Sequence, residues 1–90
     1  MIYASEADLL NMALFGKTAA DWRYENPDDK GNMRDDATLE QLVVLSNLES
    51  INAVLIRQGL EQTDRLKQLN QIAITQMTSL VKNANMKKLK

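Results

Sequence analysis

The spacing of apolar residues is helical along nearly the whole chain. Residues 6–15 predict a first helix, whose apolar face carries Leu9, Leu10, Ala13 and Leu14. Ser5 opens this helix in the manner of a capping residue, and Gly16 provides its stop. A second short helix is predicted over residues 18–25. It must end before Pro27, because the residue preceding a proline avoids the helical conformation.

Residues 39–58 predict a longer third helix, which begins after the capping sequence Thr38-Leu39-Glu40-Gln41. Its apolar side chains point in three directions when residues are placed at 100° intervals. One stripe contains Val44, Leu48, Ile51 and Leu55, a second contains Leu42, Leu45, Ala53 and Ile56, and a third contains Leu39, Val43 and Val54. A helix that is apolar almost all round requires cover on several sides. We therefore expect it to be the centre of the fold or part of an interface between subunits.

Residues 62–82 predict a final amphipathic helix, with a continuous apolar stripe of Leu66, Leu69, Ala73, Met77 and Leu80. Residues 83–90 are lysine-rich, and we expect them to form a frayed tail. No segment shows the alternation typical of a strand. The sequence predicts an all-α fold: a compact bundle of four helices in one domain, residues 1–82, with the helix over 39–58 at its centre.

The composition argues against most enzymes. The 90 residues include no His and no Cys, which removes the usual base near neutral pH and the usual zinc and thiol chemistry. We therefore expect a non-enzymatic protein with no cofactor and no small-molecule substrate. The start of the chain resembles no secretory signal, and no stretch approaches the roughly 20 apolar residues of a membrane helix. A cytoplasmic protein without membrane contact is the expectation.

The acidic segment over residues 26–36 is the one candidate for a metal ion. Placing Gly31 at the sixth position of a calcium loop puts Lys30 at the fifth and Ala37 at the twelfth, where the loop requires oxygen ligands. We expect a solvated polar loop and no metal. A weak magnesium or calcium site is the alternative.

Two residues are open to either a packing or a binding interpretation. Trp22 fits an anchor for a partner protein, but a plug in the core beside the long helix is favoured. Asn52 lies between two apolar stripes, so it is either a buried amide that fixes helix register or a residue on an exposed rim. Candidate packing or interface residues are Trp22, Val44, Leu48, Ile51, Asn52 and Leu55. The apolar helix makes a homo-oligomer, preferably a dimer, the expected assembly.

Basic residues of the C-terminal half are weak candidates for contact with DNA phosphates. They are Arg57, Arg65, Lys67, Lys82, Lys87 and Lys88. The formal net charge of −1 counts against this role, because phosphate contacts dominate affinity for DNA.

The order of residues also resembles a known family. The resemblance rests on residues 3–11, on Ala13-Leu14-Phe15-Gly16-Lys17-Thr18-Ala19, on Trp22-Arg23, on residues 31–35, on residues 45–53 and on residues 69–77. These segments are similar to the region that follows the KilA-N domain in phage-related bacterial proteins, and the likeness covers residues 3–81. The KilA-N domain is a small α/β DNA-binding module of phages, large DNA viruses and their hosts.

This resemblance implies a helical interaction or oligomerisation module that accompanies a DNA-binding domain and carries no catalytic motif. DNA would then be contacted by the neighbouring domain. A direct DNA-contacting module is the alternative.

Overall fold

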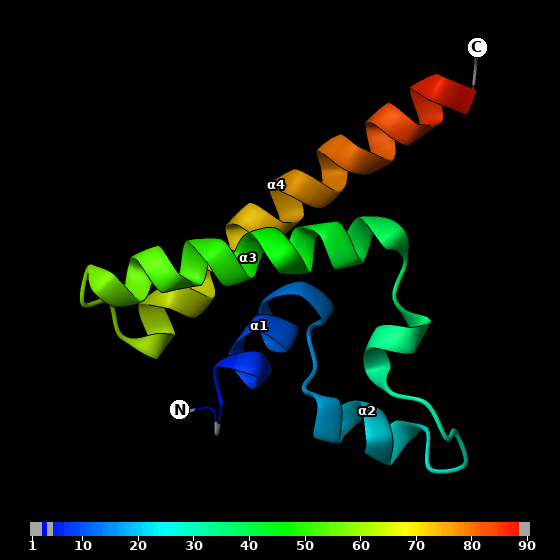
Figure 1. Ribbon diagram of the computed structural model, residues 1–90, viewed down its shortest axis with the longest axis horizontal. Helices are drawn as coiled ribbons and strands as arrows, with labels where there is room; N and C mark the ends of the chain where they lie inside the picture. Colours follow the sequence, from blue (N-terminus) through cyan, green and yellow to red (C-terminus); the bar gives the residue numbers. More distant parts are fainter. Residues whose placement is uncertain (1–2, 4, 89–90) are drawn as a thin grey trace.

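The chain is all-helical in a computed structural model that describes the backbone of residue 3 and residues 5–88, and the side chains of residue 3 and residues 5–82. In chain order the elements are α1 (Glu6–Phe15), α2 (Ala19–Glu25), the short 3₁₀ helix η1 (Met33–Asp36), α3 (Leu39–Arg57) and α4 (Gln62–Lys88). The prediction of four α-helices is confirmed (Figure 1).

The helices begin at the capping residues that the sequence indicates. Ser5 Oγ accepts a hydrogen bond from Asp8 N at the start of α1. Thr38 and Gln41 form a reciprocal capping box at the start of α3, in which each side chain accepts from the other residue's backbone N–H. Gly16 ends α1 in the left-handed conformation, with φ 74°. A residue with a Cβ rarely adopts this conformation, so glycine makes the turn at low cost.

The hydrophobic core lies between α1, α3 and α4. In Figure 1, α1 lies below α3, and α4 crosses α3 and extends beyond it. Gly59 supplies the left-handed residue, with φ 81°, in the turn between α3 and α4. Fully or nearly fully buried side chains from all three helices fill the centre: Leu9, Leu10, Ala13, Val44, Leu45, Leu48, Leu55, Leu69 and Ala73.

The molecule is flat, with extents of 45 × 38 × 16 Å. Two packed helices, whose axes lie roughly 8–10 Å apart, account for the shortest dimension. In such a flat fold α3 contacts α1 and α4 with one side only. The all-round cover expected for this apolar helix is therefore not provided by the chain itself.

Four details differ from prediction. Helix α2 begins at Ala19 instead of residue 18, and Thr18 is its N-cap. The segment over residues 26–36 is not entirely irregular, because Asn32 and Asp35 cap the short helix η1 through a reciprocal pair of side-chain contacts. Helix α3 ends at Arg57, and Gln58 is its C-cap. Helix α4 continues to Lys88 instead of ending at Lys82. No glycine or proline follows Lys82, so the backbone of residues 83–88 stays helical and forms no separate irregular tail; residues 89–90 lie outside the described part.

Candidate functional site

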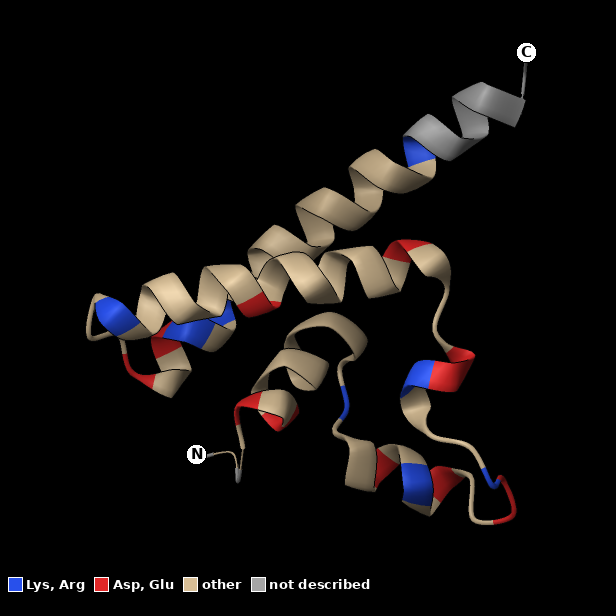
Figure 2. Cartoon of the chain, in the orientation of Figure 1, with Lys and Arg blue, Asp and Glu red and all other residues tan. Residues whose placement is uncertain are grey.

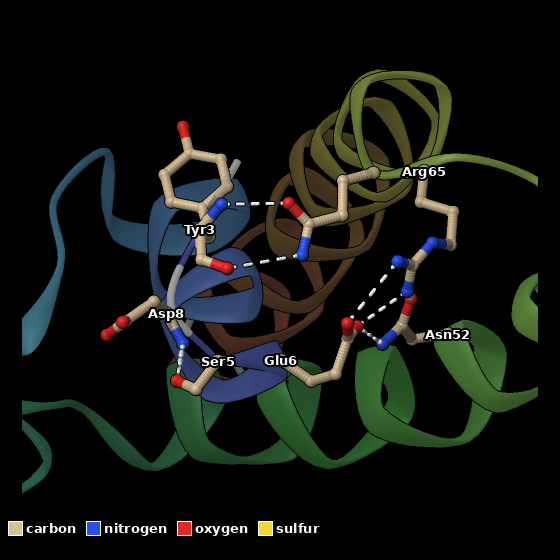
Figure 3. A network of polar contacts seen from close by, with 7 residues as sticks. Tyr3, Ser5, Glu6, Asp8, Asn52 and Arg65 are labelled. Atoms are coloured by element: carbon tan, nitrogen blue, oxygen red, sulfur yellow. Dashed lines mark hydrogen bonds and ion pairs between the residues drawn. The ribbon is translucent and has the colours of Figure 1, made fainter. Parts of the chain in front are cut away.

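A buried polar cluster joins the three core helices at one end of the fold (Figure 3). Arg65 of α4 donates from Nη1 to Glu6 Oε1 of α1 at 2.5 Å and to Asn52 Oδ1 of α3 at 3.0 Å. Asn52 Nδ2 also donates to Glu6 Oε1, at 2.8 Å. One carboxylate, one amide and one guanidinium therefore connect α1, α3 and α4 through side chains alone.

The cluster is unusual because a guanidinium group lies inside it. The side chain of Arg65 is only 7% exposed, whereas that of Glu6 is 45% exposed. The hydrogen bonds from Arg65 and then from Asn52 hold the pKa of the Glu6 carboxyl below its ordinary value. Glu6 is therefore ionised at neutral pH. With no proton to give and its oxygens committed to Arg65 and Asn52, the cluster fits a structural role better than acid–base catalysis.

A second polar contact lies beside this cluster. Gln62, the first residue of α4, accepts a hydrogen bond from Tyr3 N at 2.8 Å and donates to Tyr3 O at 3.4 Å. Its side-chain amide therefore pairs with the backbone of the segment that precedes α1, as a neighbouring strand would. This pairing places Tyr3 next to the turn between α3 and α4.

Asn52 is buried, which confirms the first of its two interpretations. It is 4% exposed, and its amide donates to Glu6 and accepts from Arg65. A buried amide with both partners fixes how far α3 can slide along α1 and α4, because a shift of one residue would break both contacts.

The predicted packing stripe of α3 lies in the core of the single chain. Val44 and Leu48 are fully buried, Leu55 is 7% exposed, and Ile51 is half-buried against the same core. These residues are therefore packing residues and are not available as an interface between copies. The exposed apolar side chains of α3 come chiefly from the other two stripes: Leu39, Leu42, Val43, Val54 and Ile56.

Trp22 is buried, but it is not part of the central core. It shares a hollow of about 180 Å³ with Met33 of η1, Phe15 at the end of α1 and Gln41 of α3. The guanidinium of Arg23 lies 5.1 Å from the centre of the Trp22 ring and donates to the carbonyl oxygens of Asp29 and Gly31. Trp22 therefore anchors α2 and the loop that follows it. Its expected burial beside the long helix is confirmed, because it lies next to Gln41 in the first turn of α3, but it lies outside the core cluster of α1, α3 and α4.

The acidic segment uses its carboxylates for local structure. Asp29 Oδ1 accepts from Gly31 N at 2.8 Å, and Asp35 Oδ2 accepts from Asn32 N at 2.9 Å. A Cβ at Gly31 would lie 2.8 Å from Asp35 Oδ2, so a larger residue here would displace the Asp35 side chain from its capping position. Among the side chains that the structure describes, no group of three or more acidic residues is arranged to hold a metal ion.

The predicted DNA-contacting residues do not form one basic surface. Arg65 is buried and paired with Glu6, so its assignment as a phosphate contact is wrong. Arg57, Lys67 and Lys82 are exposed, but they lie at different places along α3 and α4. Figure 2 shows basic residues at opposite ends of α4. The side chains of Lys87 and Lys88 lie outside the described residues.

A shallow groove between α3 and α4 is a further apolar feature of the described surface. It has a volume of about 210 Å³ and is lined by Val43 and Asn47 of α3 and by Thr75, Gln76, Ser79 and Leu80 of α4. Two of these residues join the helices directly, because Asn47 Nδ2 donates a hydrogen bond to Gln76 Oε1 at 3.0 Å. The groove borders the exposed apolar side chains of α3 and contains no titratable group.

Helix α3 also satisfies, by length and composition, a criterion for a membrane span, with mean hydropathy 1.3 over 18 residues. Core helices of soluble proteins satisfy it too, so this is weak evidence for a membrane role. In the described fold α3 packs against α1 and α4 and carries Asn52 within a charged cluster. These contacts favour a packed helix over a lipid-facing one.

Comparison with known protein families, curated proteins and solved structures finds no match to this chain.

Proposed function

We propose that this chain is a non-enzymatic helical module that self-associates through α3 and accompanies a DNA-binding domain of the KilA-N type. The observation that carries the proposal is the uncovered apolar side of α3. Leu39 is 74% exposed, Val54 is 51% exposed and Val43 is 43% exposed. These side chains lie towards the two ends of α3, on either side of the exposed Ser46 and Ser50. Exposed apolar side chains gathered on one helix are typical of a protein–protein contact.

The residues available for chemistry support this assignment. The chain has neither His nor Cys, and the acidic side chains of Glu6, Asp29 and Asp35 already accept hydrogen bonds within the fold. What the fold presents to a partner is shape and apolar surface. Binding, rather than catalysis, is the activity that such a surface supports best.

The link to a KilA-N domain rests on the sequence resemblance over residues 3–81. The electrostatics are compatible with a companion module, because the net charge of −1 and the separated basic residues leave phosphate binding to another domain. The DNA sequence that precedes residue 1 in the gene tests this link. A KilA-N module encoded in frame there supports it, and its absence contradicts it.

Sedimentation velocity over a range of micromolar concentrations tests self-association. We expect a reversible monomer–dimer equilibrium. Val54→Glu should shift it to monomer by placing a charge on the apolar surface, while the far-UV circular dichroism stays unchanged. Gln68→Glu, on an exposed position of α4, is the matched control and should leave the equilibrium unchanged. A wild-type chain that stays monomeric throughout contradicts the proposal.

Direct DNA contact is the alternative, and retardation of random duplex DNA at low salt distinguishes the two. The module proposed here should not retard DNA at micromolar concentration. Salt-sensitive retardation that disappears in a Lys67→Gln, Lys82→Gln variant would favour the alternative, since each lost phosphate contact lowers affinity.

A further inference from the structure

We infer that the occupant of the exposed α3 surface is a second copy of the chain, packed antiparallel, with the two helices crossing at Ser46 and Ser50. This inference rests on the proposed self-association and adds to it the surface, the direction and the register. It follows from three features of α3: the symmetric placement of its exposed residues, the small side chains at the middle, and the charges at its ends.

Four exposed apolar residues of α3 are placed symmetrically about the level of Leu48, whereas the exposed Leu39 and Ile56 lie outside this arrangement. Leu42 and Val54 lie six residues before and after it, and Val43 and Ala53 lie five residues before and after it. All four are exposed. Reversing the direction of one copy therefore brings the pair Leu42 and Val43 level with the pair Ala53 and Val54 of the other. A larger residue, Leu42, then packs beside a smaller one, Ala53.

Small residues occupy the middle of the same surface. Ser46 and Ser50 lie two residues on either side of Leu48, and both are exposed. Two helices approach closely where their facing side chains are small, because axis separation depends on the side chains at the contact. Their hydroxyl groups can hydrogen-bond across the contact or back to their own helix, so burying them leaves no polar group without a partner.

The charges at the two ends of α3 favour the antiparallel direction. Glu40 lies in the first turn and Arg57 is the last residue of the helix. In an antiparallel pair, Arg57 of one copy lies beside the first turn of the other, close to Glu40. In a parallel pair like charges would meet at both ends. Antiparallel packing also opposes the two helix dipoles, which is the favourable arrangement.

The size of the surface sets the expected strength. A helix of 19 residues is about 28 Å long. Two such helices bury less than the roughly 1,600 Å² of a standard stable interface. The dimer should therefore dissociate within the micromolar range, where sedimentation resolves the two species.

Disulfide trapping tests direction and register, because the chain contains no cysteine of its own. The variants Val43→Cys and Val54→Cys are mixed in equal amounts, one of them isotope-labelled, and oxidised gently. In antiparallel packing, residue 43 of one copy and residue 54 of the other lie at nearly the same height, about 1.5 Å apart along the helix axes. This packing separates the two copies of residue 43 by about 15 Å along the helices. A disulfide requires Cα atoms within about 7 Å, so the 43–54 product should predominate over both self-products.

Each outcome has one consequence. Predominance of the 43–54 disulfide supports the inference. Predominance of 43–43 and 54–54 products, or a dimer in sedimentation without any of the three disulfides, overturns the inference and leaves self-association standing. A monomer in sedimentation overturns both.

A charge-reversal series gives a second readout that does not need cysteine. Arg57→Glu should raise the dimer dissociation constant about three- to tenfold, because the symmetric dimer loses two exposed ion pairs, and adding Glu40→Arg to the same chain should restore it. Failure of the second substitution to restore association contradicts the antiparallel register.

Discussion

Arg65 Nη1 lies 2.5 Å from Glu6 Oε1, although 59 residues separate the two in sequence. This contact connects the first turn of α1 to the first turn of α4. Asn52 of α3 hydrogen-bonds to both Glu6 and Arg65. A charged side chain inside a small domain is costly unless it is paired. The integrity of this end of the fold should therefore depend on Glu6.

Glu6→Ala should lower the free energy of unfolding by about 1–2 kcal/mol, measured by urea denaturation. The substitution leaves the buried Arg65 guanidinium without its carboxylate. The effect is below that of a fully buried pair, because the Glu6 side chain is 45% exposed and solvent screens the interaction.

Asp8→Ala is the matched control, since Asp8 is also an acid in the first turn of α1. Its loss should cost no more than about 0.5 kcal/mol through the helix dipole. Equal effects of the two substitutions would show that the cluster does not stabilise the fold.

The contribution of Glu6 should be lost in acid. Because the pKa of Glu6 is lowered in the folded chain, its stabilisation is fully present above the ordinary value of 4.5 and declines as the pH falls through the folded pKa. The stability difference between the wild type and Glu6→Gln should be constant from pH 8 to 6 and should narrow below about pH 4.5. Thermal melts of both proteins from pH 8 to 3 measure it; a difference that persists unchanged at pH 3 contradicts the assignment.

Two adjacent valines should differ in what their substitution by alanine weakens: folding at one position and dimerisation at the other. Val44 is fully buried, so Val44→Ala should cost about 2 kcal/mol of folding stability. Val43 is 43% exposed, so Val43→Ala should cost little in the monomer and instead weaken dimerisation. Chemical denaturation of dilute protein and sedimentation of concentrated protein separate these effects. Similar folding costs at the two positions would mean that α3 is rotated relative to the described fold.

Thr38→Ala should destabilise the protein by about 1 kcal/mol. The substitution removes the hydroxyl that accepts from Gln41 N at 3.1 Å and opens the capping box of the central helix. Thr38→Ser keeps the acceptor and should retain most of the stability. A Ser variant as unstable as the Ala variant would assign the loss to the methyl group instead of the cap.

The helices could be predicted because their signals are local. Ser5, Thr38 and Gly16 act on backbone groups within four residues, so their patterns are visible in the sequence. The helix η1 was missed because its cap pairs two short polar residues, Asn32 and Asp35, inside a segment rich in such residues. Nothing in its composition separates it from a polar loop.

The side of α3 that forms the core could not be predicted, because it depends on where α1 and α4 lie. Three apolar stripes compete for burial, and only contact with Leu9 of α1 and Leu69 of α4 selects the stripe of Val44 and Leu48. Arg65 was assigned to DNA for the same reason, since its partner Glu6 is remote in sequence. One signal was available: Asn52 lies between Ile51 and Ala53, and a buried amide requires a polar partner.

The pairing between Tyr3 and Gln62 fixes where the chain enters this fold, beside the turn that joins α3 to α4 (Figure 1). In an antiparallel dimer this turn lies at opposite ends of the paired α3 helices. The two entry points would then lie towards opposite ends of the paired helices, each of which is about 28 Å long. Under the proposed function, two DNA-binding domains joined before Tyr3 would therefore be attached at opposite ends of the dimer, not side by side.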